Sequence, residues 1–125
     1  MNKDELLKLI SNAEIRLSPS QKRISIPIVV RIYKKMKKGL MFNSIQVAKK
    51  TIIVDGHHRY LASLLANMKL EMVEYPLTSA KKMTHWELVE FVDEDWDTPE
   101  EIKRFNEQDA RYNGMTLEAL MELIA

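Results

Sequence analysis

The residues best suited to chemistry lie together in one short segment, Asp55–Arg59, with the sequence DGHHR. A β-branched run, Ile52–Val54, precedes the segment and a helical pattern follows it, which places the segment at a strand-to-helix turn. The first amide groups of a helix lack intrahelical partners and carry partial positive charge, so they form a natural anion site. This position therefore predicts binding of a phosphate group.

Each residue of the segment offers a distinct role. Gly56 lets a ligand approach the backbone without a Cβ in the way, and Arg59 can donate two hydrogen bonds to a phosphate group. His57 and His58 can donate hydrogen bonds or shuttle protons near neutral pH, although adjacent side chains point in different directions on a helix, so at least one is expected to be structural or to face solvent. Asp55 could hold a metal ion, orient a histidine, accept a proton or simply cap the helix. The candidate catalytic residues are Asp55, His57 and His58, and the candidate phosphate ligands are Gly56, His57, His58 and Arg59.

The surrounding elements predict an α+β fold with a small mixed sheet and flanking helices. Ile45–Ala48 and Thr51–Val54 are expected to form a hairpin around a tight Lys49-Lys50 turn, and Leu70–Tyr75 to form a further strand. The uninterrupted apolar run that ends at Val54 is typical of a central strand buried on both faces. Helices are expected over residues 2–12, 25–39, 57–67 and 98–114, from Thr84, where Thr84-His85-Trp86-Glu87 has capping-box spacing, and from Thr116.

The sequence DGHHRYLA at residues 55–62 resembles the phosphate-binding motif of the ParB/sulfiredoxin superfamily. The DGHHR form is typical of its free serine kinase-like branch and of many bacterial members, and the order of strand, motif, helix and strand agrees over residues 24–76. The resemblance implies that Gly56, His57, His58 and Arg59 hold the phosphates of a nucleotide, with Asp55 beside the reactive phosphate. Sulfiredoxins carry a cysteine where this chain has His57, so sulfinic acid reduction is excluded.

Two functions follow as expectations. In the first, a ParB-like domain binds a nucleotide or another phosphorylated small molecule at Asp55–Arg59, with Mg²⁺ accompanying the nucleotide and with phosphotransferase or NTPase activity. In the alternative, the protein is a nucleic-acid-binding or nuclease-like small bacterial effector or regulator. Its predicted helix 28–38 would then contact DNA phosphates through the basic side chains Arg31, Lys34, Lys35 and Lys38.

Charge is distributed unevenly along the chain. Residues 1–82 hold sixteen basic and six acidic side chains, whereas residues 83–125 hold three basic and twelve acidic ones. Either the basic part faces phosphates or nucleic acid, or the two parts dock and neutralise each other. The acidic run Asp93–Asp97 could bind a divalent cation, cover the basic face, or form a solvated loop anchored by Trp96. We expect residues 84–125 to be a helical extension that folds against the core at 24–76.

Length and composition set the remaining limits. The 125 residues fit one domain spanning 1–125, and 46% of them are hydrophobic, which is enough for a core. With no cysteine and three histidines, zinc and haem are not expected, and no metal site is predicted. No apolar run is long enough for a membrane span, and no signal-peptide pattern is present, so the expected location is the cytoplasm.

Overall fold

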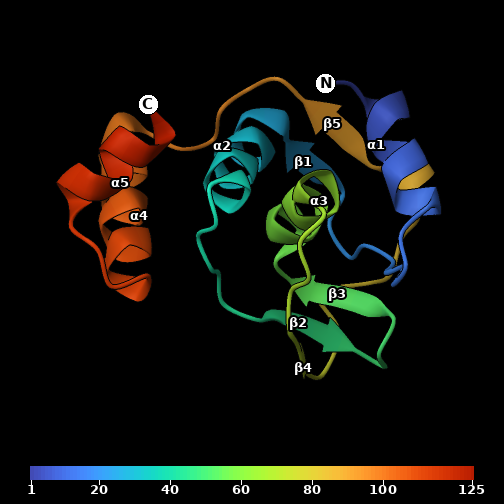
Figure 1. Cartoon of the computed structure of the whole chain (residues 1–125). Coiled ribbons are helices and arrows are strands. Elements are labelled where there is room, and N and C mark those ends of the chain that lie inside the picture. Colours follow the sequence, from blue (N-terminus) through green and yellow to red (C-terminus); the bar gives the residue numbers. More distant parts are fainter.

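The computed structural model describes all 125 residues and has an α+β fold with five α-helices and a small mixed sheet, as expected (Figure 1). No helix is both long and apolar enough to cross a membrane. The elements follow in the order α1 (Lys3–Ser11), β1 (Arg23–Ser25), α2 (Ile26–Lys37), β2 (Ile45–Ala48), β3 (Ile52–Asp55), α3 (His57–Ala66), β4 (Met72–Glu74), the 3₁₀ turn η1 (Trp86–Leu88), β5 (Glu90–Val92), α4 (Pro99–Tyr112) and α5 (Leu117–Ile124).

The three-stranded sheet has the order β3-β2-β4, with β3 antiparallel and β4 parallel to β2. The predicted hairpin is confirmed. Its two turn residues, Lys49 and Lys50, both adopt positive φ angles, 53° and 62°. Two consecutive residues of positive φ are what a two-residue hairpin turn needs to match the twist of its strands. The predicted strand at 70–75 is also present, in the shorter form of β4.

The prediction that the Ile52–Val54 run forms the central strand is wrong, because β2 occupies the centre of the sheet. The run is nevertheless buried at every position. The outer edge of β3 is covered by the segment around Ser18, whose N–H donates to the Thr51 carbonyl at 2.7 Å and whose carbonyl accepts from the Ile53 N–H at 2.9 Å. A buried edge strand with a loop paired to it therefore has the same apolar pattern as a central strand.

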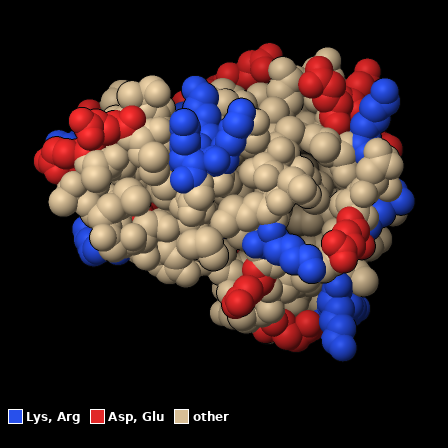
Figure 2. All heavy atoms as spheres, in the orientation of Figure 1, with Lys and Arg blue, Asp and Glu red and all other residues tan.

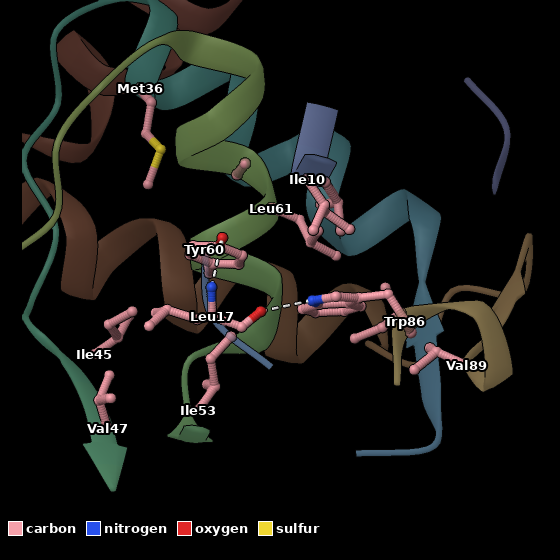
Figure 3. Close-up of a cluster of buried hydrophobic side chains, with 13 residues drawn as sticks. Ile10, Leu17, Met36, Ile45, Val47, Ile53, Tyr60, Leu61, Trp86 and Val89 are labelled. Atoms are coloured by element: carbon pink, nitrogen blue, oxygen red, sulfur yellow. Dashed lines mark hydrogen bonds between the residues drawn. The ribbon is translucent and has the colours of Figure 1, made fainter. Parts of the chain in front are cut away.

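The main core lies between α1, α2, α3 and the sheet, and Trp86 closes one side of it (Figure 3). The Trp86 indole N–H donates to the Leu17 carbonyl at 2.8 Å, and the Leu17 N–H donates to the Tyr60 hydroxyl at 3.2 Å. The Tyr60 hydroxyl in turn donates to the Ile15 carbonyl at 2.9 Å, while its ring stacks on Trp86. These bonds attach the irregular segment after α1 to helix α3, which begins within the DGHHR sequence.

The predicted helix from Thr84 is wrong. The chain there makes a single 3₁₀ turn, η1, and then strand β5, which pairs in parallel with β1. Thr84 does not cap a helix, since the 3₁₀ turn begins only after His85, and the Thr84 N–H donates to the Pro19 carbonyl at 2.8 Å. Trp86 and Val89 instead enter the main core, so this part of the acidic region does pack where expected.

Helices α4 and α5 form an antiparallel pair beside α2, at the opposite end of the molecule from α1 (Figure 1). The helix predicted over residues 98–114 is confirmed as α4, and Thr98 and Glu101 form a capping box at its start with reciprocal bonds of 3.0 and 3.1 Å. We expected this part of the chain to pack on the main core, but the α4–α5 pair does not do so. It forms a separate small cluster with the chain after α2, in which Leu40, Ala110 and Leu120 are buried.

Candidate phosphate-binding site

The DGHHR segment forms the predicted strand-to-helix turn. Strand β3 ends at Asp55, Gly56 adopts a left-handed conformation with φ of 105°, and α3 begins at His57. A Cβ atom on Gly56 would lie 2.5 Å from Cγ2 of Ile45 and 3.0 Å from Nη2 of Arg59. Only glycine fits here, both because of the backbone conformation and because the turn passes close to β2.

The turn opens into a groove with a volume of about 900 Å³. All five residues of Asp55–Arg59 line it, and α2 and α4 supply its other walls. No side chain caps the first turn of α3, so the amide groups there have no side-chain acceptor. The structure thus brings the five predicted site residues together on one groove, at an uncapped helix start.

Both histidines use their Nε2 atoms to hold the chain between α1 and α2. Nε2 of His57 accepts a hydrogen bond from the Ser20 N–H at 2.9 Å, and Nε2 of His58 accepts one from the Ser25 N–H at 3.0 Å. A neutral imidazole has one acceptor and one donor nitrogen, so each ring carries its proton on Nδ1. Neither Nδ1–H donates to another protein group. Since every buried side-chain nitrogen of the protein has a hydrogen-bond partner, both Nδ1 atoms are accessible to solvent.

Burial lowers the pKa of both histidines. The pKa of His57 falls to about 3, because the ring is buried and because His58 and Lys81 add positive charge nearby. The pKa of His58 falls to about 4, again through burial, with Asp97 partly opposing the shift. Rings that are neutral at pH 7 and whose Nε2 lone pairs are occupied have no site to accept a proton. The lowered pKa values therefore argue against the expectation that the rings shuttle protons near neutral pH and favour neutral hydrogen-bond donors.

The Arg59 side chain is held in place by three hydrogen-bond acceptors. Its side chain is 21% exposed, and Nη1 donates to the carbonyls of Asn43 and Ser44 at 3.1 and 3.3 Å. Nη2 donates to Oδ2 of Asp55 at 3.1 Å. Asp55 thus pairs with Arg59 instead of capping α3, and its side chain remains largely exposed at the rim of the groove.

The basic residues of α2 divide into two groups. Arg31 pairs with both Asp95 and Asp97, and buried Lys35 donates to Oδ2 of Asp109 at 2.6 Å. Of the four residues predicted to contact nucleic acid, these two are neutralised by the acidic part of the chain, and both line the groove. Lys34 and Lys38 remain exposed, and basic side chains gather over α2 in Figure 2. The docking of the two oppositely charged parts is confirmed.

Several residues of the site give no signal in the sequence. Ser20 and Ser25 fix the histidine tautomers through backbone N–H groups, which every residue type except proline carries. Asp97 lines the groove, and so do the aromatic rings of Phe105 and Tyr112 on α4. These α4 residues are 40 or more positions from the motif, and only the docking of the helix pair brings them to it.

No group of three or more histidine, aspartate or glutamate side chains is arranged to hold a metal ion. Comparison of the chain with known proteins finds no match among family models, among curated proteins or among solved structures.

Proposed function

We propose that this protein binds the phosphate group of a nucleotide, or of another phosphorylated small molecule, at the Asp55–Arg59 turn, as a ParB/sulfiredoxin-like domain would. One observation carries the proposal. An uncapped helix start, a fixed arginine and two neutral histidines with free Nδ1–H donors all line one groove of about 900 Å³. Such a set of donors suits an anion with several oxygen atoms.

Each residue has a role in this proposal. The amide groups of the first turn of α3 donate to the phosphate, and Gly56 leaves the backbone open to it. Arg59, oriented by the carbonyls of Asn43 and Ser44, presents its remaining N–H groups. His58 adds an Nδ1–H donor that stays in place over the physiological pH range, because its pKa is lowered to about 4. His57 is more deeply buried and mainly fixes the turn to Ser20.

Binding has more direct support than phosphoryl transfer. Neither histidine has a free basic nitrogen, so Asp55 is the one candidate base within the motif. Asp55 also fits a nucleotide-bound Mg²⁺, because this ion takes one or two protein carboxylates and completes its shell with phosphate oxygens and water. The ion would supply charge neutralisation on the phosphates, while Asp55 would hold it at the rim of the groove.

The test compares ligands and a matched pair of arginine variants. Isothermal titration with ATP, AMP and pyrophosphate, each with and without Mg²⁺, measures the affinity of the wild type. Arg59→Lys retains the charge but loses the planar fork, and we expect it to weaken binding about tenfold or more. Arg104→Lys makes the same change on the outer side of α4, away from the groove, and should leave binding unchanged. Equal affinities for the two variants, or no binding of any phosphate by the wild type, would refute the proposal.

Asp55→Asn distinguishes a binding module from an enzyme. If Asp55 holds Mg²⁺ or acts as the base, nucleotide binding should survive the change while phosphate release falls, as measured by a colorimetric phosphate assay. The same panel includes a short DNA duplex as the alternative ligand. Salt-sensitive DNA binding that is lost on changing Lys34 and Lys38, and that is indifferent to Arg59→Lys, would support the nucleic-acid function instead.

A further inference from the structure

An internal anion already lies in the proposed phosphate site. The Asp97 side chain lines the same groove as Gly56–Arg59 and is only 16% exposed. Its Oδ2 atom accepts from Nη2 of Arg31 at 2.8 Å, and Asp95 accepts from the same guanidinium group. Arg31 lines the groove together with Arg59 and Arg111, and its guanidinium group, which could otherwise bind a phosphate, is engaged by carboxylates of the chain itself.

Asp97 also lies close to the motif. Its negative charge favours the protonated form of His58 and opposes the fall in the pKa of that ring. The neighbouring Trp96 packs edge-on against His58, with ring centroids 5.5 Å apart. The carboxylate is therefore held between Arg31 and the start of α3, where a bound phosphate group would experience strong repulsion from it.

The acidic segment Asp93–Asp97 leads directly into α4, and the α4–α5 pair has few attachments to the rest of the molecule. These attachments are the Lys35–Asp109 ion pair, two hydrogen bonds between the Asn113 side chain and the Met41 backbone, and the small cluster around Leu40. The first two are polar, and only the Lys35 pair lies on α2 itself, because Leu40 and Met41 belong to the chain that follows it. We call Asp93–Asp97 together with the α4–α5 pair the arm. Loss of the ion pairs between Arg31 and the two aspartates would thus act on an arm whose contacts with the core are limited.

We propose that Asp97 is an autoinhibitory anion: it competes with a phosphate ligand for the groove, and ligand binding releases Asp93–Asp97 from α2 and shifts the α4–α5 pair outward. This inference rests on the proposed phosphate site, which it supplements with a regulatory contact. A ligand that favours the released arm binds more weakly while the arm is docked. By linkage, the factor by which the ligand shifts the arm towards release equals the factor by which release of the arm strengthens ligand binding.

The first measurement follows the arm without any ligand. The chain contains no cysteine, so Glu71→Cys and Glu118→Cys, both exposed and on opposite sides of the α2–α4 contact, accept a pair of spin labels. We expect Asp97→Asn to broaden or lengthen the distance distribution between the labels. Asp93→Asn removes the same charge from the same segment, but Asp93 is exposed and outside the Arg31 pairs, and this control should leave the distribution unchanged.

The second measurement titrates pyrophosphate and ATP into the same proteins. Asp97→Asn should bind each ligand about two- to tenfold more tightly than the wild type, whereas Asp93→Asn should bind with wild-type affinity. Saturating ligand should give the labelled wild type the distance distribution of Asp97→Asn. Circular dichroism verifies that each variant is folded. As a perturbation without any substitution, we expect about 1 M salt to loosen the arm of the wild type, because screening weakens the ion pairs.

Unchanged distances in both Asp97→Asn and high salt would overturn the release of the arm. Weaker ligand binding by Asp97→Asn would overturn the competition, since Asp97 would then support the site rather than block it. If neither the wild type nor any variant binds phosphate, the proposed phosphate site fails, and ligand-driven release of the arm fails with it. If Asp97→Asn still loosens the arm in that case, the experiment establishes only that the ion pairs of Arg31 hold the arm in place.

Discussion

The two histidines of the DGHHR segment should make the stability of the fold strongly dependent on pH. In the unfolded chain both titrate near 6.5, whereas in the folded protein the pKa of His57 is about 3 and that of His58 about 4. A histidine whose folded pKa is lowered binds fewer protons when folded than when unfolded between these values. The stability is therefore highest above pH 6.5 and falls as the pH decreases towards 4.

The magnitude follows from the width of that window. From about pH 6.5 down to pH 5, a span of about 1.5 pH units, each histidine is protonated in the unfolded chain but neutral in the folded one. Over this span the free energy of unfolding falls by about 1.4 kcal/mol per pH unit for each ring. Each thus lowers the free energy of unfolding by about 2 kcal/mol, and together they lower it by about 4 kcal/mol. Because a small domain is stable by about 5–15 kcal/mol, this loss brings the protein towards unfolding at pH 5.

Urea unfolding at a series of pH values from 8 to 5, followed by tryptophan fluorescence, measures this loss. His57→Gln removes one titrating ring and retains an oxygen acceptor for the Ser20 N–H, so it should reduce the pH dependence by about half, to about 2 kcal/mol. In the folded wild type, the NMR shifts of both rings should stay nearly constant over the same range. A loss of less than about 1 kcal/mol, or folded-state titration of either ring near pH 6.5, would refute the reasoning.

Two predictions concern stability at neutral pH. In thermal melts, Gly56→Ala should lower the free energy of unfolding by about 2–4 kcal/mol, because the new Cβ would strain a backbone of φ 105° and collide with Ile45. The control Gly114→Ala has no atom within 4 Å of its new Cβ and should lower the free energy of unfolding by only about 1 kcal/mol. Tyr60→Phe removes a hydroxyl that accepts from the buried Leu17 N–H, so chemical unfolding should show a loss of about 1–3 kcal/mol, and a loss near zero would mean that water replaces the hydroxyl.

Elements determined by near neighbours could be predicted from the sequence. The hairpin at Lys49-Lys50 was predictable from two extended runs two residues apart, and the start of α4 from Thr98 and Glu101. The start of α3 after Gly56 was equally clear, because the switch from a β-branched run to a helical pattern allows few other conformations. In each case the deciding interactions join residues within about four positions of each other, so a local pattern contains them.

Elements determined by distant partners could not be predicted. Strand β1 has three residues and pairs with β5, 67 positions later, so neither strand is long enough to show a periodic pattern. The capping-box spacing at Thr84 was misleading, since the chain makes only one 3₁₀ turn there before β5 pairs with the distant strand β1. The edge position of β3 was hidden for a related reason: the Ser18 segment covers it, and burial looks the same from the sequence whatever provides it.

The candidate site divides in the same way. The sequence by itself determined which residues form the strand-to-helix turn, because Asp55–Arg59 are consecutive and the turn requires Gly56. Tertiary structure alone decided what those residues can do: backbone groups of Ser20 and Ser25 occupy the Nε2 atoms, burial lowers the histidine pKa values, and Asp97 reaches the groove although it lies 38 positions after Arg59 in the sequence. Protonation state and accessibility depend on every group packed around a side chain, and that environment exists only once the chain has folded.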